Sequence, residues 1–407
     1  MDLSATLPGV ALDPAAYAVG GRAPRLAVRP ASREELAELL RAASRDRLAM
    51  LPWGGGSAAP FDVAPERYDL AIDVTSLNKI VEYDPEDLTV TAECGVTLET
   101  LRNTLAARGQ ELPIEGAHAT RATLGGALAA NSSGARRLRM GAPRDRLLGA
   151  RFALADGTLA HTGGKVVKNV SGHAVHRLLC GSRGALAVFV EASLKLLPAP
   201  AMRRALVFHA DAAQLRDAAR WADLPRLEPS AMTVVSRATA ASIAGLATQA
   251  PYVIAVVLED EAPWVERQTA LIEDALGVAD LRIEGEPVVA LTQALCDAPE
   301  NWSRRLTLTT AWNSPAALGV IDLDVAPSEL VFHSLAGRLH LEPIDALPIT
   351  EVQRLAGNGF SSLDCRGTER FAPSPPASAV GTLRRRIRAA LDPEALWARG
   401  SSWESNR

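Results

Sequence analysis

Apolar residues recur with a helical period in SREELAELLRAASR, residues 32–45. The leucines of this stretch fall on one helical face, and Ser32 stands where a residue that caps the first turn is expected. The apolar run LAMLPW at 48–53 then predicts a short strand, and it ends at three consecutive glycines, 54–56. The chain therefore begins with a helix and a strand that lead into a glycine-rich loop.

Strand and helix patterns alternate after this loop. Residues 68–77 and 88–96 predict strands, with a turn at DPED, 84–87. Residues 97–109 predict a capped helix that stops at Gly109. The order of helix, strand, glycine loop, two strands and helix predicts an α+β domain rather than a βαβ repeat.

A boundary is expected near residue 200, where the prolines of PAPAMRR follow an apolar strand at 185–198. Before that strand, ADGT at 155–158 marks a turn between paired strands. After the boundary, strand and helix patterns alternate again and predict an open sheet covered by helices. The strands are expected at 205–210 and 252–260, and the helices at 212–224, 264–277 and 382–396, while further segments lie at 306–312, 319–325 and 328–343. The arginines of the last helix are interpreted as a solvated face rather than a nucleic-acid contact.

Composition narrows the class of protein. The chain has 407 residues, a formal charge of -4 and 48% hydrophobic residues, so it has room for an enzyme but no large cationic surface for nucleic acid. The start MDLSATLPGVALDP lacks a charged leader, and no apolar run reaches about 18 residues, so a cytoplasmic protein without direct membrane insertion is expected. The four cysteines form no CxxC pair, so we expect reduced thiols and no metal site.

The glycine run in LPWGGGSAAPF has two interpretations. A surface turn or linker is the simpler one, and a phosphate cradle formed by converging amide groups is the other. The common nucleotide motifs GxGxxG and GxxxxGK[ST] are absent, as is HExxH. A second segment rich in small residues, GAHATRATLGGALAANSSG at 116–134, lies about 60 residues further on.

Five motifs in order decide between these interpretations: WGGGS, ATLGGALAANSSG, MGAPRDRLLG, ADGTL and GGKVVKNVSGHAVHRLLCGSRGALAVFVEASLKLLPAP. Over about residues 20–200 the chain resembles the FAD-linked oxidases of the p-cresol methylhydroxylase and vanillyl-alcohol oxidase superfamily. SGARR at 133–137 and GGKVVKNVSG at 163–172 are similar to the FAD-binding subunit of bacterial glycolate oxidase. The resemblance implies an α+β fold, with a two-part FAD-binding domain (1–200), a smaller α+β cap domain for the substrate (201–345) and a C-terminal segment (346–407) that returns towards the FAD domain.

The resemblance also implies the residues that bind FAD. The two small-residue loops close over opposite sides of the dinucleotide, and glycines leave room for many N–H donors around the buried pyrophosphate. Because Ser57 stands where some relatives attach the flavin through histidine, non-covalent FAD is expected. The expected cofactor-binding residues are Pro52, Gly54, Gly55, Gly56, Ser57, Ala122, Thr123, Gly125, Gly126, Ala129, Ser132, Gly134, Lys168, Asn169, Gly184 and Val188.

The chain also departs from the family's pattern. The usual GSLGTLGV reads GSRGALAV here, which places Arg183, Ala185 and Ala187 beside the expected flavin path. The GYD sequence is replaced by Gly172 and His173 followed by alanine, and the C-terminal NPG is lost.

Oxidation of a 2-hydroxy acid needs a cation for the carboxylate and a base for the hydroxyl proton. His333, His340 and His173 are the candidate bases, and His173 and His176 could share a helical face or simply be core residues. The arginines 136, 137 and 139 suit either an anion or a docking surface.

The function expected from the resemblance is an FAD-dependent oxidoreductase subunit. It oxidises a small hydroxy acid such as glycolate or lactate and passes electrons to partners, a second flavoprotein subunit and an iron–sulfur subunit. The alternatives are a flavin-poor structural subunit of the same complex and a standalone alcohol or sugar oxidase.

Overall fold

The computed structural model describes residues 7–57, 65–165, 172–216, 227–302, 305–310, 329–333, 338–342, 360–366 and 379–398. The chain divides into two compact units. The first comprises residues 1–132, 142–199 and 373–407, and the second comprises 133–141 and 200–372. A short segment, 133–141, therefore leaves the first unit and belongs to the second.

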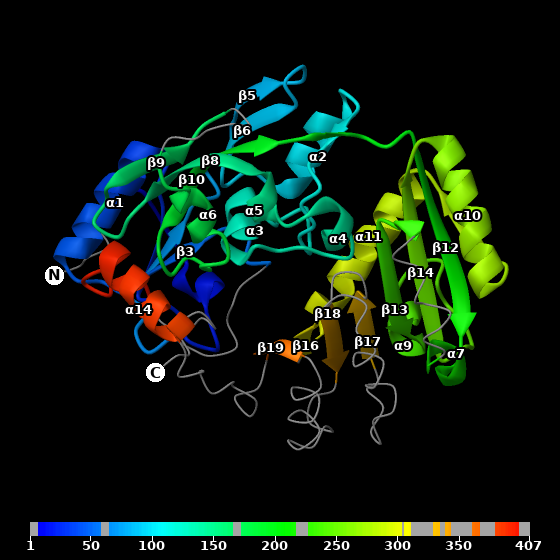
Figure 1. Cartoon of the computed structure of the whole chain (residues 1–407). Helices are drawn as coiled ribbons and strands as arrows, with labels where there is room; N and C mark the ends of the chain where they lie inside the picture. The colour runs from blue at the N-terminus through cyan, green and yellow to red at the C-terminus, as the bar shows by residue number, and fades with distance from the viewer. Residues whose placement is uncertain are drawn as a thin grey trace. The chain divides into compact units, whose positions relative to one another are not determined.

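The first sheet of unit 1 carries the glycine-rich loop at the end of one of its strands. Its strand order is β1-β2-β4-β3, in which β2 and β3 run parallel to β4 and β1 is antiparallel. Helix α1 lies beside it (Figure 1) and begins after Ser32, whose Oγ accepts a hydrogen bond from the Glu35 amide at 3.1 Å. Leu36, Leu39 and Leu40 of α1 are fully buried, as their spacing predicted. The elements are β1 (Val10–Leu12), β2 (Leu26–Arg29), α1 (Arg33–Arg45), β3 (Met50–Trp53) and β4 (Leu70–Asp73).

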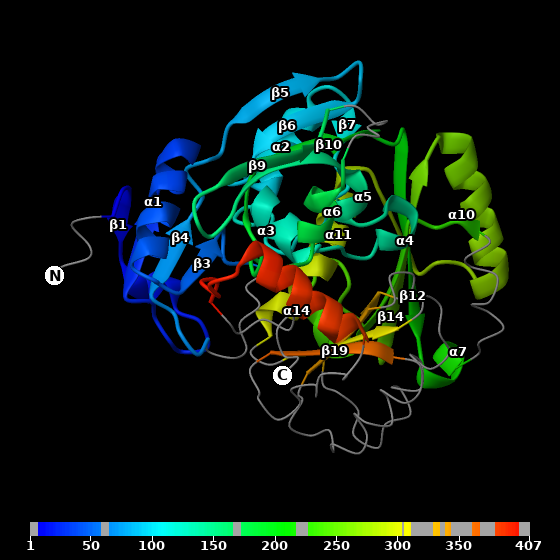
Figure 2. The same ribbon diagram turned by 60° about the vertical axis from the view of Figure 1, so that its left-hand side comes forward.

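The second sheet of unit 1 is antiparallel, with the order β5-β6-β10-β8-β9 (Figure 2). The turn at ADGT joins β8 to β9 as expected, and the helix predicted at 97–109 is α2, capped by Thr97. The sheet's elements are β5 (Ile80–Asp84), β6 (Thr89–Glu93), β8 (Leu147–Ala153), β9 (Leu159–Gly163) and β10 (Val188–Lys195). Around it lie α2 (Leu98–Ala106), α3 (Leu124–Ala130), α5 (Pro143–Arg146), α6 (Val175–Leu179) and the pair β7 (Gln110–Glu111) and β11 (Leu197–Pro198).

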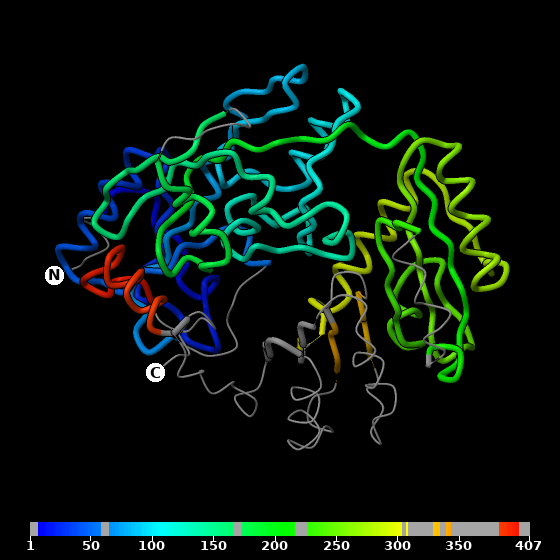
Figure 3. Tube along the Cα trace, in the orientation of Figure 1, coloured from blue at the N-terminus to red at the C-terminus, as the bar shows by residue number. Residues whose placement is uncertain are grey.

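The C-terminal part of the chain returns to the first sheet of unit 1. The trace in Figure 3 follows the red helix α14 (Ala379–Leu391) back to the blue N-terminal elements. The Met50 amide donates to the Leu396 carbonyl, and the Ala398 amide donates to the Met50 carbonyl, both at 2.7 Å. The helix predicted at 382–396 therefore ends before Pro393, because the chain turns there to pair with β3. Arg385 and Arg386 are exposed, as a solvated face requires.

In the described residues, unit 2 is built on an eight-stranded sheet with the order β15-β12-β14-β13-β17-β18-β16-β19, antiparallel throughout. Helix α10 covers one face, and α9 and α11 cover the other (Figure 1). The predicted open sheet and the α+β class are confirmed, while the further segment at 319–325 lies outside the described residues. The elements are α4 (Arg137–Met140), β12 (Met202–Ala210), α7 (Ala212–Arg216), β13 (Ala231–Ser236), α9 (Arg237–Ala241), β14 (Tyr252–Asp260), α10 (Ala262–Leu276), β15 (Leu281–Glu284), α11 (Glu286–Asp297), β16 (Arg305–Thr310), β17 (Glu329–His333), β18 (Arg338–Glu342) and β19 (Phe360–Arg366).

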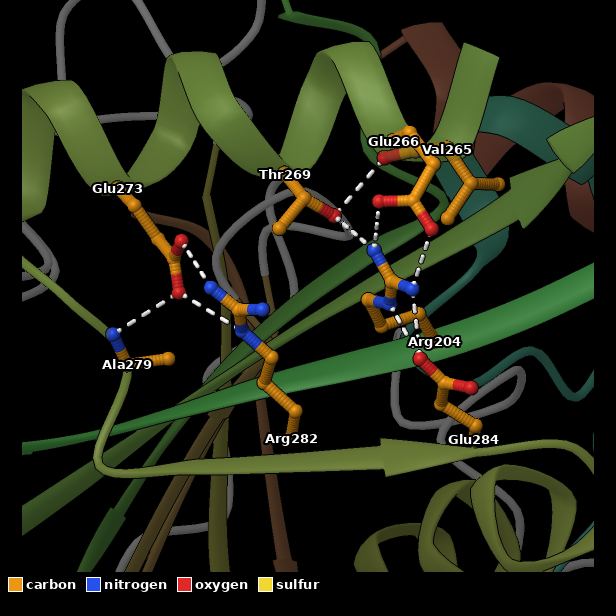
Figure 4. Close-up of polar contacts among 8 residues, drawn as sticks. All are labelled: Arg204, Val265, Glu266, Thr269, Glu273, Ala279, Arg282 and Glu284. Atoms are coloured by element: carbon orange, nitrogen blue, oxygen red, sulfur yellow. Dashed lines mark hydrogen bonds and ion pairs between the residues drawn. The ribbon is translucent and has the colours of Figure 1, made fainter. Parts of the chain in front are cut away.

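A buried arginine joins α10 to the edge of this sheet (Figure 4). Arg204 of β12 donates to Glu266 of α10 at 2.7 Å, to Glu284 of β15 at 2.6 Å and to Thr269 at 3.0 Å. Its side chain is 6% exposed, and its hydrogen bonds, first those to Glu266, raise its pKa further. Since every partner belongs to unit 2, this network holds the helix on the sheet.

Candidate functional site

A pocket in unit 1 lies where three chain segments converge. The first is the glycine-rich loop after β3, the second is helix α3, and the third is the turn that leads into β10. Together they border roughly 700 Å³ of space that is open to solvent in part. The lining residues are Pro52, Trp53, Gly54, Gly55, Gly56, Ser57, Val74, Thr123, Gly125, Gly126, Ala129, Ala130, Arg183, Gly184, Ala187, Val188 and Phe189.

Two glycines of the first segment are required by close contact with the second. A Cβ at Gly55 would lie 1.5 Å from the Arg121 carbonyl oxygen, and one at Gly54 would lie 2.2 Å from Thr123 Oγ1. Gly56 adopts a φ of 66°, which glycine tolerates at little cost. The glycine run is therefore a shaped loop pressed against the start of α3, which excludes its interpretation as a flexible linker.

The residues of the glycine-rich loop line the pocket, and their backbone amides are available as donors. Within the described part of the chain, nothing accepts a hydrogen bond from the amides of Gly54, Gly55, Gly56 or Ser57. Several unpaired backbone amides that follow one another on a pocket wall suit an anionic ligand. Thr123 caps α3 by accepting from the Gly126 amide at 3.2 Å. This arrangement fits the pyrophosphate of a dinucleotide.

A polar network contacts Trp53, the residue that precedes the glycine-rich loop. Trp53 packs edge-on against Tyr17, with ring centroids 5.4 Å apart. The Tyr17 hydroxyl donates to Asp73 Oδ2 at 2.5 Å, and Arg29 donates to the same oxygen at 2.7 Å. Burial and the bond to Asp73 raise the pKa of Tyr17 to about 12. Burial alone would raise the pKa of Asp73, but the hydrogen bonds from Arg29, Thr75 and Tyr17 outweigh it and lower that pKa.

The pocket brings together eleven of the residues expected from the sequence. Ala122 is instead buried in the core, and its carbonyl accepts from the Leu98 amide. Ser132 ends the second loop outside the lining, and Gly134 belongs to unit 2. Lys168 and Asn169 lie outside the described residues. The eleven are Pro52, Gly54, Gly55, Gly56, Ser57, Thr123, Gly125, Gly126, Ala129, Gly184 and Val188.

Six lining residues are not among those that the family resemblance implies. Trp53 both packs on Tyr17 and lines the pocket. Arg183 and Ala187 were noticed as departures from the family's pattern, which was the available signal. Val74, Ala130 and Phe189 are apolar or small, and nothing in their sequence context distinguishes them from core residues.

The candidate bases His333 and His340 lie next to each other in unit 2. Their rings meet edge-on, with centroids 5.9 Å apart. Thr233 Oγ1 bonds to Nδ1 of His333, and Thr307 Oγ1 to Nδ1 of His340, each at 2.9 Å. The two side chains are 3% and 8% exposed. Because a threonine holds each ring at Nδ1, both imidazoles have a defined orientation.

His173 and His176 do not share a face. His173 is exposed and precedes α6, whereas His176 lies within the helix and is buried. Thr162 Oγ1 lies 3.0 Å from His176 Nδ1 and accepts from the His176 amide at the same distance. Burial first, and then the neighbouring Arg177, lower the pKa of His176. His176 is therefore a satisfied core residue.

Two of the three neighbouring arginines are held by carboxylates of unit 2. Arg136 contacts both oxygens of buried Glu259, at 3.0 and 3.2 Å, and Arg139 reaches Asp260 at 2.5 Å. The guanidinium of Arg139 also lies 4.9 Å from the centroid of the Trp264 ring. These contacts fasten segment 133–141 to the end of β14.

Within the described ranges, no group of three or more His, Cys, Asp or Glu side chains is placed to hold a metal ion. The helices of these ranges are too short or too polar to cross a bilayer. The described cysteines Cys94, Cys180 and Cys296 are free thiols, and burial raises the pKa of Cys180 to about 12.

Comparison with known families defines the class. Residues 24–163 match the FAD binding domain family, so the part of the chain that holds the glycine loop and α3 is an FAD-binding domain. This confirms the expected resemblance to the FAD-linked oxidases and the expectation of FAD as cofactor.

Individual relatives agree with this class. The chain is 31% identical over 290 residues to glycolate oxidase subunit GlcD of Bacillus subtilis, covering 67% of this chain and 60% of that protein. It is 42% identical over 130 residues to glycolate oxidase subunit GlcE of Escherichia coli, covering 32% of this chain and 37% of that protein. The chain thus spans less than two thirds of the length of either relative.

A solved structure extends the likeness in fold to nearly the whole chain. The glucooligosaccharide oxidase of Acremonium strictum superposes with a TM-score of 0.67 at 14% identity, covering 94% of this chain and 91% of that one. At this identity the similarity concerns the fold alone.

Proposed function

We propose that this protein binds FAD non-covalently in the pocket of unit 1 and acts as an FAD-dependent oxidoreductase on a small 2-hydroxy acid. The observation that carries the proposal is the loop 54–57, whose unpaired amides line a pocket inside a domain of the FAD-binding family. Two similar proteins are subunits of glycolate oxidase, which supports a hydroxy acid of glycolate size as the substrate.

The pocket of unit 1 and the histidine pair of unit 2 are assigned separate tasks. Bound FAD supplies the acceptor for the hydride. The amides of the glycine loop hold its phosphates, while Val74, Ala187 and Phe189 form an apolar part of the pocket wall. We assign removal of the hydroxyl proton to the histidine pair, His333 or His340, because each imidazole is held in one orientation by a threonine.

The proposed electron acceptor is a partner subunit. Support comes from the two glycolate oxidase relatives, both of which are named as subunits. We propose a second flavoprotein and an iron–sulfur protein as the other members of the complex. Co-expression with candidate subunits, followed by size-exclusion chromatography, tests this part independently of FAD binding.

The experiment on the reaction has two steps. The purified protein is loaded with FAD, and free cofactor is removed. Glycolate or lactate is then added without oxygen, and bleaching of the visible flavin band is followed. Replacement of His333 or His340 by glutamine is expected to slow bleaching by about 10²- to 10⁴-fold, the usual contribution of a general base. Absence of FAD binding, or full-speed bleaching in both variants, would contradict the respective assignment.

A second function is favoured by one observation. Apart from Arg183, the described residues that line the pocket carry no ionisable side chain, and His333 and His340 are almost fully buried. A pocket with one charged side chain and buried histidines is what we expect of a structural subunit that keeps the fold while a partner performs the chemistry. A melting curve with FAD at 100 times its dissociation constant discriminates, because binding adds about 2.7 kcal/mol of stability. An unchanged melting temperature would favour the structural subunit.

A further inference from the structure

Arg183 stands on the pocket wall in a backbone conformation that arginine seldom adopts. Its φ is 52°, in the left-handed region, and Gly184 follows with a φ of 80°. The left-handed region costs a residue with a Cβ roughly 1 kcal/mol, and glycine or asparagine would fill it more cheaply. Strain of this kind is tolerated where the surrounding structure fixes it, and it is common at binding sites.

The surrounding contacts fix this turn in place. The Arg183 amide donates to the Ala129 carbonyl of α3 at 2.8 Å, and the Ala185 amide donates to the Ser182 carbonyl at 3.0 Å. A Cβ at Gly184 would lie 2.8 Å from Pro52 Cγ, so the turn is pressed against the strand that leads to the glycine loop. Position 183 is thus held between the other two segments of the pocket.

Charge distinguishes Arg183 from the other lining residues. Among the described residues that border the pocket, it is the one with a charged side chain. FAD brings a pyrophosphate with two negative charges, and a charge on the pocket wall that pairs with this anion adds to the attraction of the loop amides. A guanidinium can donate two parallel hydrogen bonds to phosphate oxygens, and it stays charged at every physiological pH.

We propose that Arg183 is a cofactor-binding residue of this chain that pairs with the pyrophosphate of FAD. The inference rests on the proposed binding of FAD in this pocket. Pairing between Arg183 and the pyrophosphate would make FAD retention depend on ionic strength. This pairing also gives a role to the position at which the chain departs from the family's usual leucine.

The test compares two ligands that share the isoalloxazine ring but differ in phosphate. Dissociation constants for FAD and for riboflavin are measured by flavin fluorescence on the wild-type protein, Arg183→Asn and Arg183→Lys. Asparagine accepts a left-handed φ, so this variant removes the charge without adding strain to the turn. Arg177→Leu, an exposed arginine of α6 outside the pocket lining, is the matched control.

We expect Arg183→Asn to weaken FAD binding by about 10- to 100-fold, the range for loss of a charge-assisted pair. Riboflavin binding is expected to stay unchanged, Arg183→Lys to fall between, and Arg177→Leu to match the wild type. The salt dependence of FAD binding is expected to be shallower in Arg183→Asn.

Two results would overturn the inference alone. Either Arg183→Asn binds FAD as tightly as the wild type, or it loses riboflavin to the same degree, which would assign Arg183 to the ring or the loop. If the wild-type protein binds no FAD at all, the proposed function fails with it. Far-ultraviolet circular dichroism of each variant confirms that the fold is kept, and Arg183→Lys provides the comparison if the asparagine variant does not fold.

Discussion

Replacing Gly55 by alanine tests whether the shape of the glycine loop makes the binding site. The new Cβ would lie 1.5 Å from the Arg121 carbonyl oxygen, where ordinary contact begins at 3.4 Å. Two backbone segments would therefore have to separate by about 2 Å, at a cost of about 1–3 kcal/mol or more. The movement would carry the amides of the loop away from the phosphates.

The expected loss of affinity follows from those amides. A hydrogen bond to a charged group contributes about 1.5–3 kcal/mol, so losing two of them removes about 3–6 kcal/mol. This corresponds to a roughly 10²- to 10⁴-fold rise in the dissociation constant for FAD. Isothermal titration calorimetry measures the constant, and the melting temperature of the FAD-free protein reports the cost in stability.

Gly126→Ala is the matched comparison. Gly126 lines the same pocket, but its Cβ would have Thr123 Oγ1, at 3.2 Å, as its nearest neighbour, and alanine is favoured in a helix. We expect FAD affinity within a few-fold of the wild type. If Gly55→Ala retained FAD within threefold, the loop could not be the phosphate cradle. Equal loss in both variants would indicate that pocket space, rather than loop shape, limits binding.

Three further predictions concern stability and are checked by denaturant or thermal unfolding. The buried carboxylate of Asp392 accepts hydrogen bonds from two backbone amides, so Asp392→Ala is expected to lower the free energy of unfolding by about 2–4 kcal/mol. A loss below about 0.5 kcal/mol would contradict the role of the C-terminal turn. Glu259→Gln leaves Arg136 opposite a neutral partner, with an expected loss of about 1–3 kcal/mol, and high salt should not reproduce the loss because Glu259 is buried. Folding lowers the pKa of Asp73, so this carboxylate stabilises the fold above its unfolded pKa, near 4, and the stabilisation is lost as pH falls through the folded pKa. Asp73→Asn should therefore weaken the dependence of the free energy of unfolding on pH in this acidic range, and an unchanged slope would refute the assignment.

Local sequence patterns predicted an element correctly where its bounds depend only on its own residues. Helix α1 follows from leucines spaced for one face and a serine cap, and both are local features. The strand at 68–77 was less well defined, because only Leu70–Asp73 pairs with neighbouring strands. The ends of a strand depend on its partners, which the pattern of one segment does not contain.

The candidate site, like the fold, was predicted from the sequence only in part. Small residues and motif order marked the glycine loop, α3 and the start of β10 as parts of one site, and these segments do converge. The sequence left the arginines at 136 and 139 as candidates for either an anion or a docking surface, and in the structure Glu259 and Asp260 hold them. A carboxylate more than 100 residues away is invisible to a local pattern.

Residue spacing and residue size are local properties, so they predict the secondary-structure class, the FAD-binding family and the positions where backbone must come close to a ligand or to another segment. Which residues line the pocket follows only from the tertiary fold. Whether Arg183 lines it, whether Ala122 retreats into the core, and whether His333 meets His340 all depend on how segments far apart in the chain pack, and packing is set by the sum of many contacts.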